Sequence, residues 1–140
     1  MQGPCAIGRI GPDGPWIGFQ AAAPGYRLVV GTGSGVRSRE ADADLLLALA
    51  IAYFEEAFDD APPEVEATHA DLGELVRHVA AQERDGARTR LLSEAVDAID
   101  DGLAGDAVAN RLNAARSGTA DEQADPVDLL VTLTEELLRN

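Results

Sequence analysis

The sequence predicts a single α+β domain, in which a small antiparallel sheet of about three strands packs on a buried central helix with three or four further helices. Two observations favour this fold. Residues 1–36 hold nine of the fourteen glycines and four of the seven prolines, separated by short apolar runs, which is typical of strands joined by turns. In residues 37–140, alanine and leucine predominate and apolar residues recur at helical spacing, which favours helices.

Three short apolar runs predict the strands. The runs CAIGRI and PWIGFQA flank the tetrapeptide GPDG, and glycine, proline and aspartate are typical of a hairpin turn. The run YRLVV follows APG and predicts a third strand. Because the connections are short, we expect the three strands to form an antiparallel meander.

The central helix is predicted from an apolar stretch that has no polar side. Ser38 is the expected N-cap, and the acidic residues after it suit the positive end of a helix dipole. Leu45 to Phe54 are apolar on every side of the helix, so we expect this segment to be buried all round. Pro62 and Pro63 forbid its continuation.

Two further helices are predicted from a cap and from apolar spacing. Thr68 and Asp71 have the spacing of a capping box. The apolar residues after them recur as on one face of a helix, which Gly86 is expected to end. A similar stripe from Leu92 to Ile99 predicts the next helix.

Two shorter signals predict the C-terminal helices. A short helix around Val108 to Leu112 is expected to be capped by Asp106. The segment SGTADEQ predicts a polar loop. After it, Asp125 is the expected N-cap and Pro126 the first helical residue, where a missing backbone donor costs nothing.

The charge of the chain is strongly negative. Aspartate and glutamate number 25 against 11 arginines, lysine is absent, and the formal net charge is −14. These acids are spread along the helical segments, which indicates a solvated coat rather than an acidic tail. Repulsion within the coat is screened in concentrated salt, where the Debye length falls from about 10 Å at 0.1 M to about 3 Å at 1 M. We expect a halophilic protein, since the composition resembles that of salt-loving archaea; codon bias in a high-GC bacterium is the alternative.

The cysteine content and the apolar runs bear on compartment and partners. Cys5 is the only cysteine, which excludes an internal disulfide and suits a reducing compartment. The first residues lack the pattern of a signal peptide, and the longest apolar run, LLLALAIAYF, covers about half of a membrane span. A protein that binds nucleic acid needs clustered basic residues to neutralise the phosphates. The arginines of this chain are instead interleaved with acidic residues. We expect a cytoplasmic protein with no nucleic-acid or membrane partner, no metal and no cofactor.

A glycine-rich stretch, GTGSGVRSR, is the candidate ligand site. A P-loop needs a lysine that reaches the phosphates, and a dinucleotide fingerprint needs a glycine where Val36 stands. Backbone N–H groups, a helix N-terminus and two arginines can still bind a small anion; the alternative is a tight turn that needs glycine for its conformation. The candidate anion-binding residues are Gly31, Gly33, Ser34, Gly35, Arg37 and Arg39.

The order of the predicted elements gives a remote alternative. Three strands, an acid-bearing helix and EVEATHAD as a fourth strand distantly resemble the ribonuclease H fold, which implies a metal-dependent nuclease. The resemblance implies metal-binding carboxylates at Asp13, Glu40 and Asp71. The chain departs from the family because Asp13 lies in the turn-like GPDG and no fifth strand is evident. Whether residues 64–68 form a strand stays open at this point.

The last predicted helix carries more apolar residues than one buried stripe uses. In a monomer some of them would be exposed, and an exposed apolar patch marks a partner site; the alternative is that they complete the core. Leu129, Leu133 and Leu137 are the candidate interface for a protein partner or a homodimer.

No catalytic group is evident in the sequence, because neither of the two histidines has a nucleophile or a set of metal ligands at suitable spacing. We therefore expect a non-catalytic intracellular protein-binding or regulatory module of a salt-adapted organism. The alternative is a phosphate- or nucleotide-binding protein or enzyme that uses the turn from Gly31 to Arg39.

Overall fold

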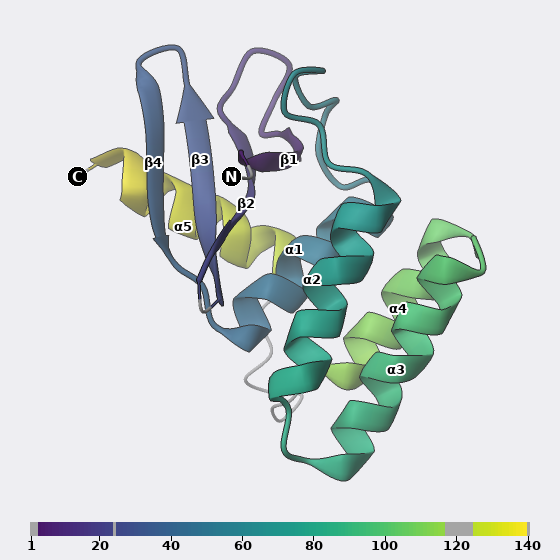
Figure 1. The fold of residues 1–140 in the computed structure, drawn as a ribbon. Helices are drawn as coiled ribbons and strands as arrows, with labels where there is room; N and C mark the ends of the chain where they lie inside the picture. The colour runs from purple at the N-terminus through teal and green to yellow at the C-terminus, as the bar shows by residue number, and fades with distance from the viewer. Residues whose placement is uncertain (1–2, 24, 117–124, 140) are drawn as a thin grey trace.

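A computed structural model describes residues 3–23, 25–116 and 125–139 and confirms the α+β fold (Figure 1). The strands are β1 (Cys5–Arg9), β2 (Trp16–Ala22), β3 (Gly25–Thr32) and β4 (Gly35–Glu40). The helices are α1 (Ala43–Phe54), α2 (His69–Gln82), α3 (Gly86–Asp100), α4 (Gly105–Ala115) and α5 (Pro126–Arg139). The segment SGTADEQ, predicted to be a polar loop, lies outside the described residues.

The sheet is an antiparallel meander in the order β1-β2-β3-β4. The three predicted strands are present and pair in sequence. The fourth strand, β4, pairs with β3 from Arg27↔Glu40 to Thr32↔Gly35 and was not predicted. The strand-rich part of the chain therefore reaches Glu40 rather than residue 36.

The prediction that Ser38 caps the central helix is wrong. Ser38 lies inside β4 and pairs with Val29. The helix begins at Ala43, and its N-cap is Asp42, whose Oδ1 accepts a hydrogen bond from the Leu45 N–H at 2.9 Å. The physical reason is the tight turn before β4, which returns the chain along β3 before any helix can start.

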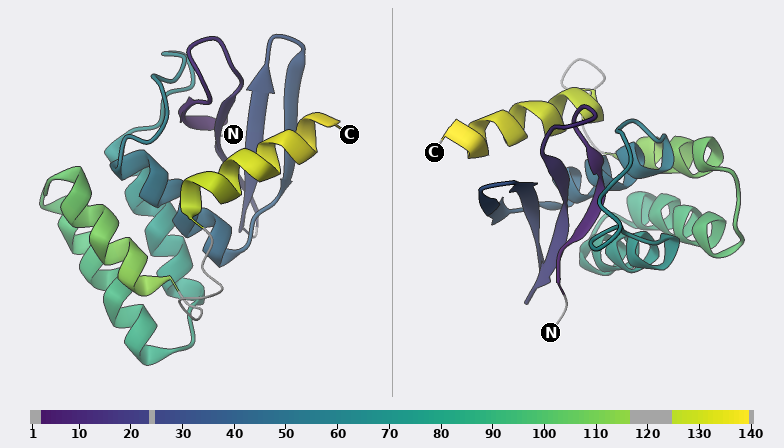
Figure 2. Two further views of the ribbon diagram at one scale, coloured as in Figure 1. Left: turned by 180° about the vertical axis from the view of Figure 1, so that it is seen from behind. Right: turned by 90° about the horizontal axis from the view of Figure 1, so that it is seen from above.

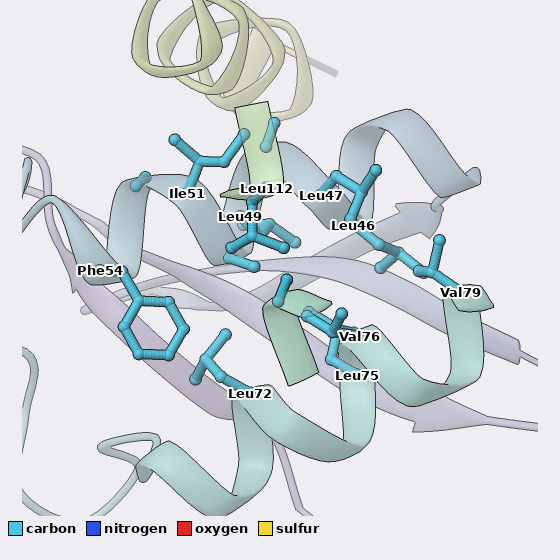
Figure 3. Close-up of a cluster of buried hydrophobic side chains, with 14 of the residues drawn as sticks. Leu46, Leu47, Leu49, Ile51, Phe54, Leu72, Leu75, Val76, Val79 and Leu112 are labelled. Carbon is cyan, nitrogen blue, oxygen red and sulfur yellow. The ribbon is translucent and has the colours of Figure 1, made fainter. Parts of the chain in front are cut away.

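Helix α1 is the buried central helix, as predicted from its lack of a polar face. Its residues from Leu45 to Ala52, and Phe54, are all buried. Figure 3 shows leucines of α1 packed against Leu72, Leu75, Val76 and Val79 of α2 and against Leu112 of α4. Each fully buried side chain of this size contributes about 1.5–3 kcal/mol relative to an exposed one, so α1 organises the core.

The predicted caps are correct for two of the helices. Thr68 and Asp71 form the capping box of α2, with Thr68 Oγ1 accepting from the Asp71 N–H at 3.2 Å. Asp125 Oδ1 accepts from the Val127 N–H at 2.9 Å at the start of α5. Both helices begin where a short polar side chain can satisfy the first free N–H groups.

The roles predicted for Gly86 and Asp106 are wrong. Gly86 begins α3 instead of ending α2, because Asp85 caps α3. Asp106 lies in the first turn of α4 and does not cap it; Ala104 holds the cap position without a side-chain bond. Gly105, the first residue of α4, packs against the end of α1, where a Cβ would lie 2.2 Å from the Phe54 carbonyl oxygen.

The helices lie on one face of the sheet. In Figure 1, α5 passes behind β3 and β4, and in the rear view of Figure 2 it passes in front of them. α1 packs against β1, β2 and β3 of the sheet and against α2, α4 and α5, and α3 packs on α2 and α4. No helix in the described ranges is long and apolar enough to cross a membrane.

The segment between α1 and α2 runs along the free edge of β1. The Ala6 N–H donates to the Val65 carbonyl at 2.6 Å and the Ala67 N–H donates to the Ala6 carbonyl at 2.8 Å, which makes one parallel bridge between Ala6 and Glu66. Residues 64–68 thus contribute a single bridge rather than a named strand. Because of these bonds the β1 edge is partly covered by the protein's own chain.

Candidate functional site

The glycine-rich stretch forms the hairpin between β3 and β4. Thr32 pairs with Gly35, so Gly33 and Ser34 make a two-residue loop. The Ser34 N–H donates to Thr32 Oγ1 at 3.1 Å. Gly35 has a φ of +139°, a conformation that side chains rarely adopt. The alternative interpretation, a tight turn that needs glycine for its conformation, therefore explains the glycine at position 35.

Arg37 and Arg39 point from β4 towards α5. Arg37 Nη1 donates to the Leu137 carbonyl at 3.0 Å, near the negative end of the α5 dipole. Arg39 Nη1 lies 3.9 Å from the Glu136 carboxylate. The next helix begins only at Ala43, so the helix N-terminus expected at this turn lies elsewhere. Anion binding by the turn stays a prediction, and its two arginines have partners within the chain.

The three leucines predicted as an interface lie along α5. Leu129, Leu133 and Leu137 are half-buried and pack against the core cluster. Leu130 and Thr134 lie deepest in the contact, and Thr134 Oγ1 donates to the Leu130 carbonyl at 2.8 Å. The protein's own core therefore covers part of each of these leucines, and their role towards a partner stays a prediction.

The carboxylates implied by the ribonuclease H resemblance are not grouped. Asp13 lies in the β1–β2 turn, Glu40 ends β4, and Asp71 is in the first turn of α2. Asp71 Oδ2 already accepts from the Thr68 N–H at 2.9 Å. Among the described residues, no three histidine, cysteine, aspartate or glutamate side chains come together as metal ligands. A nuclease site of this kind finds no support in the described part of the chain.

A cleft of about 750 Å³ opens at the C-terminal end of α1. Tyr53, Phe54 and Phe58 supply aromatic surface, and the ring centroid of His69 lies 5.6 Å from that of Tyr53. The acidic residues of the lining are Glu55, Glu56, Asp59, Asp60, Glu66 and Asp106. The cleft therefore combines aromatic surface with strong negative charge.

The chemistry of this cleft is limited by its groups. Burial, with smaller effects from Glu66, Asp71 and Glu56, raises the pKa of Tyr53, so its hydroxyl stays protonated and can only donate or accept a hydrogen bond. Glu56, which follows the C-cap residue Glu55 of α1, has a φ of +53°, and its N–H donates to the Tyr53 carbonyl at 3.2 Å. The cleft can attract a cation, but the metal-ligand grouping noted above is missing from the residues described.

The face of the sheet that points away from α1 and α5 is the second candidate surface, and we call it the outer face. Successive residues of a strand point to opposite faces. Ile17, Leu28 and Val30 join the core with α1, so their neighbours along β2 and β3 point outwards. Over β2, β3 and β4, the outer face consists of Trp16, Gly18, Gln20, Arg27, Val29, Gly31, Val36, Ser38 and Glu40. Over β3 and β4, none of the helices drawn in Figures 1 and 2 crosses this face.

One row is apolar across β2, β3 and β4, and Arg9 of β1 ends it beyond Trp16. Trp16, Gly31 and Val36 are paired in register on β2, β3 and β4. The Trp16 ring lies directly over Gly31, where a Cβ would come within 2.0 Å of it. Trp16 is half-buried, and Val36 is 58% exposed, the highest value among the large apolar residues described. Val29 lies buried in the next row without joining the core cluster.

The opposite end of the outer face is polar and carries both signs of charge. Gln20, Arg27 and Glu40 are paired in register across the three strands. Arg27 Nε donates to Ser38 Oγ at 3.0 Å, which holds the guanidinium over β4. Glu40 is exposed, and no other described residue forms an ion pair with it. The outer face therefore has an apolar end and a charged end, with Val29 buried between them.

Sequence reasoning missed the outer face, although a signal for it exists. Trp16 and Ile17 are adjacent large apolar residues in one strand, and Val29 and Val30 are adjacent in the next. Adjacent apolar residues point to opposite faces, which is typical of strands that are covered on both sides. The face could not be assembled without β4, which the sequence did not predict.

Comparison with known proteins gives no protein-family model that matches this chain, and no curated protein or solved structure that matches it. No family is therefore assigned. The function has to be inferred from the fold and from the surfaces described above.

Proposed function

We propose that this chain is a non-catalytic intracellular protein-binding module and that the outer face is its binding surface. The observation that carries the proposal is the apolar row of Trp16, Gly31 and Val36, which the chain's own helices leave uncovered. Tryptophan is enriched at protein interfaces because it offers a large apolar area with a polar N–H. The row lies on an open sheet surface, which suits a protein partner better than a small ligand, since small ligands need concave sites.

The other two surfaces support binding less well. The leucines of α5 are already half-buried against the core. The acidic cleft offers charge without a group of metal ligands among the described residues. The outer face combines an exposed apolar residue, an aromatic ring and both signs of charge.

We infer in addition that the module works in concentrated salt. All the described aspartates and glutamates are exposed or half-buried, so the acidic coat faces solvent, and repulsion within it falls as salt is added. Urea unfolding in potassium chloride from about 0.1 M to about 1 M tests this, because the Debye length falls about threefold over that range. We expect the free energy of unfolding to rise with salt. Equal stability throughout would contradict the inference.

A photo-crosslinking experiment tests the binding role of the outer face. A photo-reactive phenylalanine derivative replaces Val36 in one variant, and it replaces Glu94, an exposed residue of α3, in a matched control. After irradiation in salt-rich cells, we expect a discrete crosslinked species from position 36 that the control does not give. The absence of such a species would overturn the proposed function.

A further inference from the structure

We propose that the partner on the outer face is a second copy of this chain, so that two sheets pack face to face in a symmetric dimer. The proposal rests on the binding role proposed above and adds the identity of the partner. Its basis is that the outer face is complementary to itself when it is rotated about one particular axis.

The axis runs parallel to the strands, midway between β3 and β4. A half-turn about this axis places β3 of one copy opposite β4 of the other. Each outer residue of β3 then faces, in the other copy, the β4 residue with which it pairs in its own chain. Arg27 pairs with Glu40 across the two strands, so Arg27 of one copy faces Glu40 of the other. The interface is isologous, and the same contact forms twice. Sheets packed in this way lie about 10 Å apart, a gap that long side chains can span.

Charge complementarity selects this axis over its neighbours. An axis along β3 itself would place Arg27 of one copy on Arg27 of the other, which is repulsive. An axis between β3 and β4 gives two Arg27–Glu40 contacts instead. The bond from Arg27 Nε to Ser38 Oγ holds the guanidinium over β4, and its Nη atoms are left to reach the second copy.

The apolar end of the face is complementary about the same axis. Val36 pairs with Gly31 across the strands, so Val36 of one copy faces Gly31 of the other, which lies under the Trp16 ring. Tryptophan is a typical anchor of an interface, although Arg9 of β1 pairs with Trp16 on its other side. Contact with the second copy would cover Val36, which is the most exposed large apolar residue among those described.

The net charge of the chain adds a salt dependence. Each copy carries a formal charge of −14, so two copies repel one another at long range in dilute salt. At about 1 M salt the Debye length is about 3 Å, which screens this repulsion but not a pair of charges in contact. Dimer formation is therefore expected to strengthen as salt rises.

A charge exchange tests the dimer by sedimentation velocity in about 1 M potassium chloride. The wild-type chain should form a dimer. Arg27→Glu and Glu40→Arg should each weaken the dimer by about tenfold or more, because each places like charges in both contacts. The double variant should restore the dimer, since the two contacts then form with their charges exchanged.

A matched exchange on the helices controls for effects of charge alone. Arg77 and Asp100 form an exposed ion pair between α2 and α3, and Arg77→Glu with Asp100→Arg should leave the dimer unchanged. Circular dichroism checks that every variant is folded. A double variant of Arg27 and Glu40 that fails to restore the dimer would overturn the proposed geometry.

The crosslink at position 36 separates this proposal from the proposed function. A crosslinked species with the mass of two chains supports both. A species that contains a different protein, together with a wild-type chain that sediments as a monomer, overturns the dimer and leaves the binding role standing. A monomer that gives no crosslink overturns both.

Discussion

The two faces of the sheet carry similar apolar residues but differ in what covers them. On the inner face, Leu28 and Val30 are buried under the central helix. On the outer face, Val29 from the same strand is buried without joining that core, and Val36 is 58% exposed. The difference shows that the helices cover only one side of the sheet. Val29 is already buried within the single chain, so we infer that association covers the exposed Val36.

The largest difference between the faces should appear in stability. Leu28→Ala on the inner face opens a cavity in the core, and we expect it to lower the free energy of unfolding by about 2–5 kcal/mol. Val36→Ser on the outer face should change the stability of the monomer by less than about 0.5 kcal/mol, because the residue is already 58% exposed. Urea unfolding at low protein concentration measures both. Equal losses would show that Val36 is packed in the monomer.

The second difference concerns thiol reactivity. Burial, with smaller effects from Asp71 and Glu74, raises the pKa of Cys5 from 9.0 to about 11. At pH 8 the thiolate fraction of Cys5 should therefore be about a hundredfold below that of an ordinary cysteine. The iodoacetamide rate should stay low and rise as the pH approaches 11. A matched probe on the outer face, Ser38→Cys in a Cys5→Ser chain, should react at an ordinary rate.

The same shift has a consequence for stability. Because the folded state raises the pKa of Cys5, it favours the neutral thiol. This stabilisation of the folded state is fully present below the pKa that Cys5 has in the unfolded chain, and it is lost as the pH rises through about 11. A Cys5→Ser chain should lack this part of the alkaline destabilisation. The same alkaline profile in both chains would contradict the raised pKa.

The third difference tests the contact between Trp16 and Gly31. Gly31→Ala should cost about 1–3 kcal/mol, because its Cβ would displace the ring above it. In a Trp16→Ala chain the same substitution should cost much less, since no ring is left to displace. A double-mutant cycle by urea unfolding measures the coupling. Additive losses would show that the ring does not lie over Gly31.

A smaller loss of stability than that of Leu28→Ala or Gly31→Ala is expected at the contact between α5 and the inner side of β4. Arg37→Ala removes the bond to the Leu137 carbonyl, and we expect a loss of about 1 kcal/mol, since the bond is exposed. Hydrogen exchange in the last turn of α5 should become faster, while exchange in α1 should not change. A uniform increase over both helices would mean that the arginine supports the whole core.

The sequence predicts the elements whose signals are local. The central helix follows from ten residues without a polar face, and the α2 capping box follows from the spacing of Thr68 and Asp71 alone. Strand β4 lacks such a signal, because its inward positions hold Arg37 and Arg39 instead of apolar residues. The partner of Arg37 lies 100 residues away on α5, so no local pattern could show that this position faces inwards.

The candidate site is harder to predict than the fold for the same reason. Trp16, Gly31 and Val36 form a row only because three strands pair in one register. Arg27 and Glu40 become neighbours only through the β3–β4 hairpin. Without β4, Gly31 and Arg37 could be interpreted as parts of an anion site, whereas the structure places them on opposite faces of one sheet.

The fluorescence of the single tryptophan tests the role of the outer face most directly. Trp16 is half-buried and lies in the proposed contact, so its emission reports on this surface without any substitution. In concentrated potassium chloride we predict that the emission shifts to shorter wavelength as protein concentration rises. The midpoint of this shift should fall at the concentration at which sedimentation shows half of the chain as dimer. Val36→Arg should abolish the shift. An emission maximum that stays constant while the dimer forms would show that association uses another surface and would contradict the assignment of the outer face.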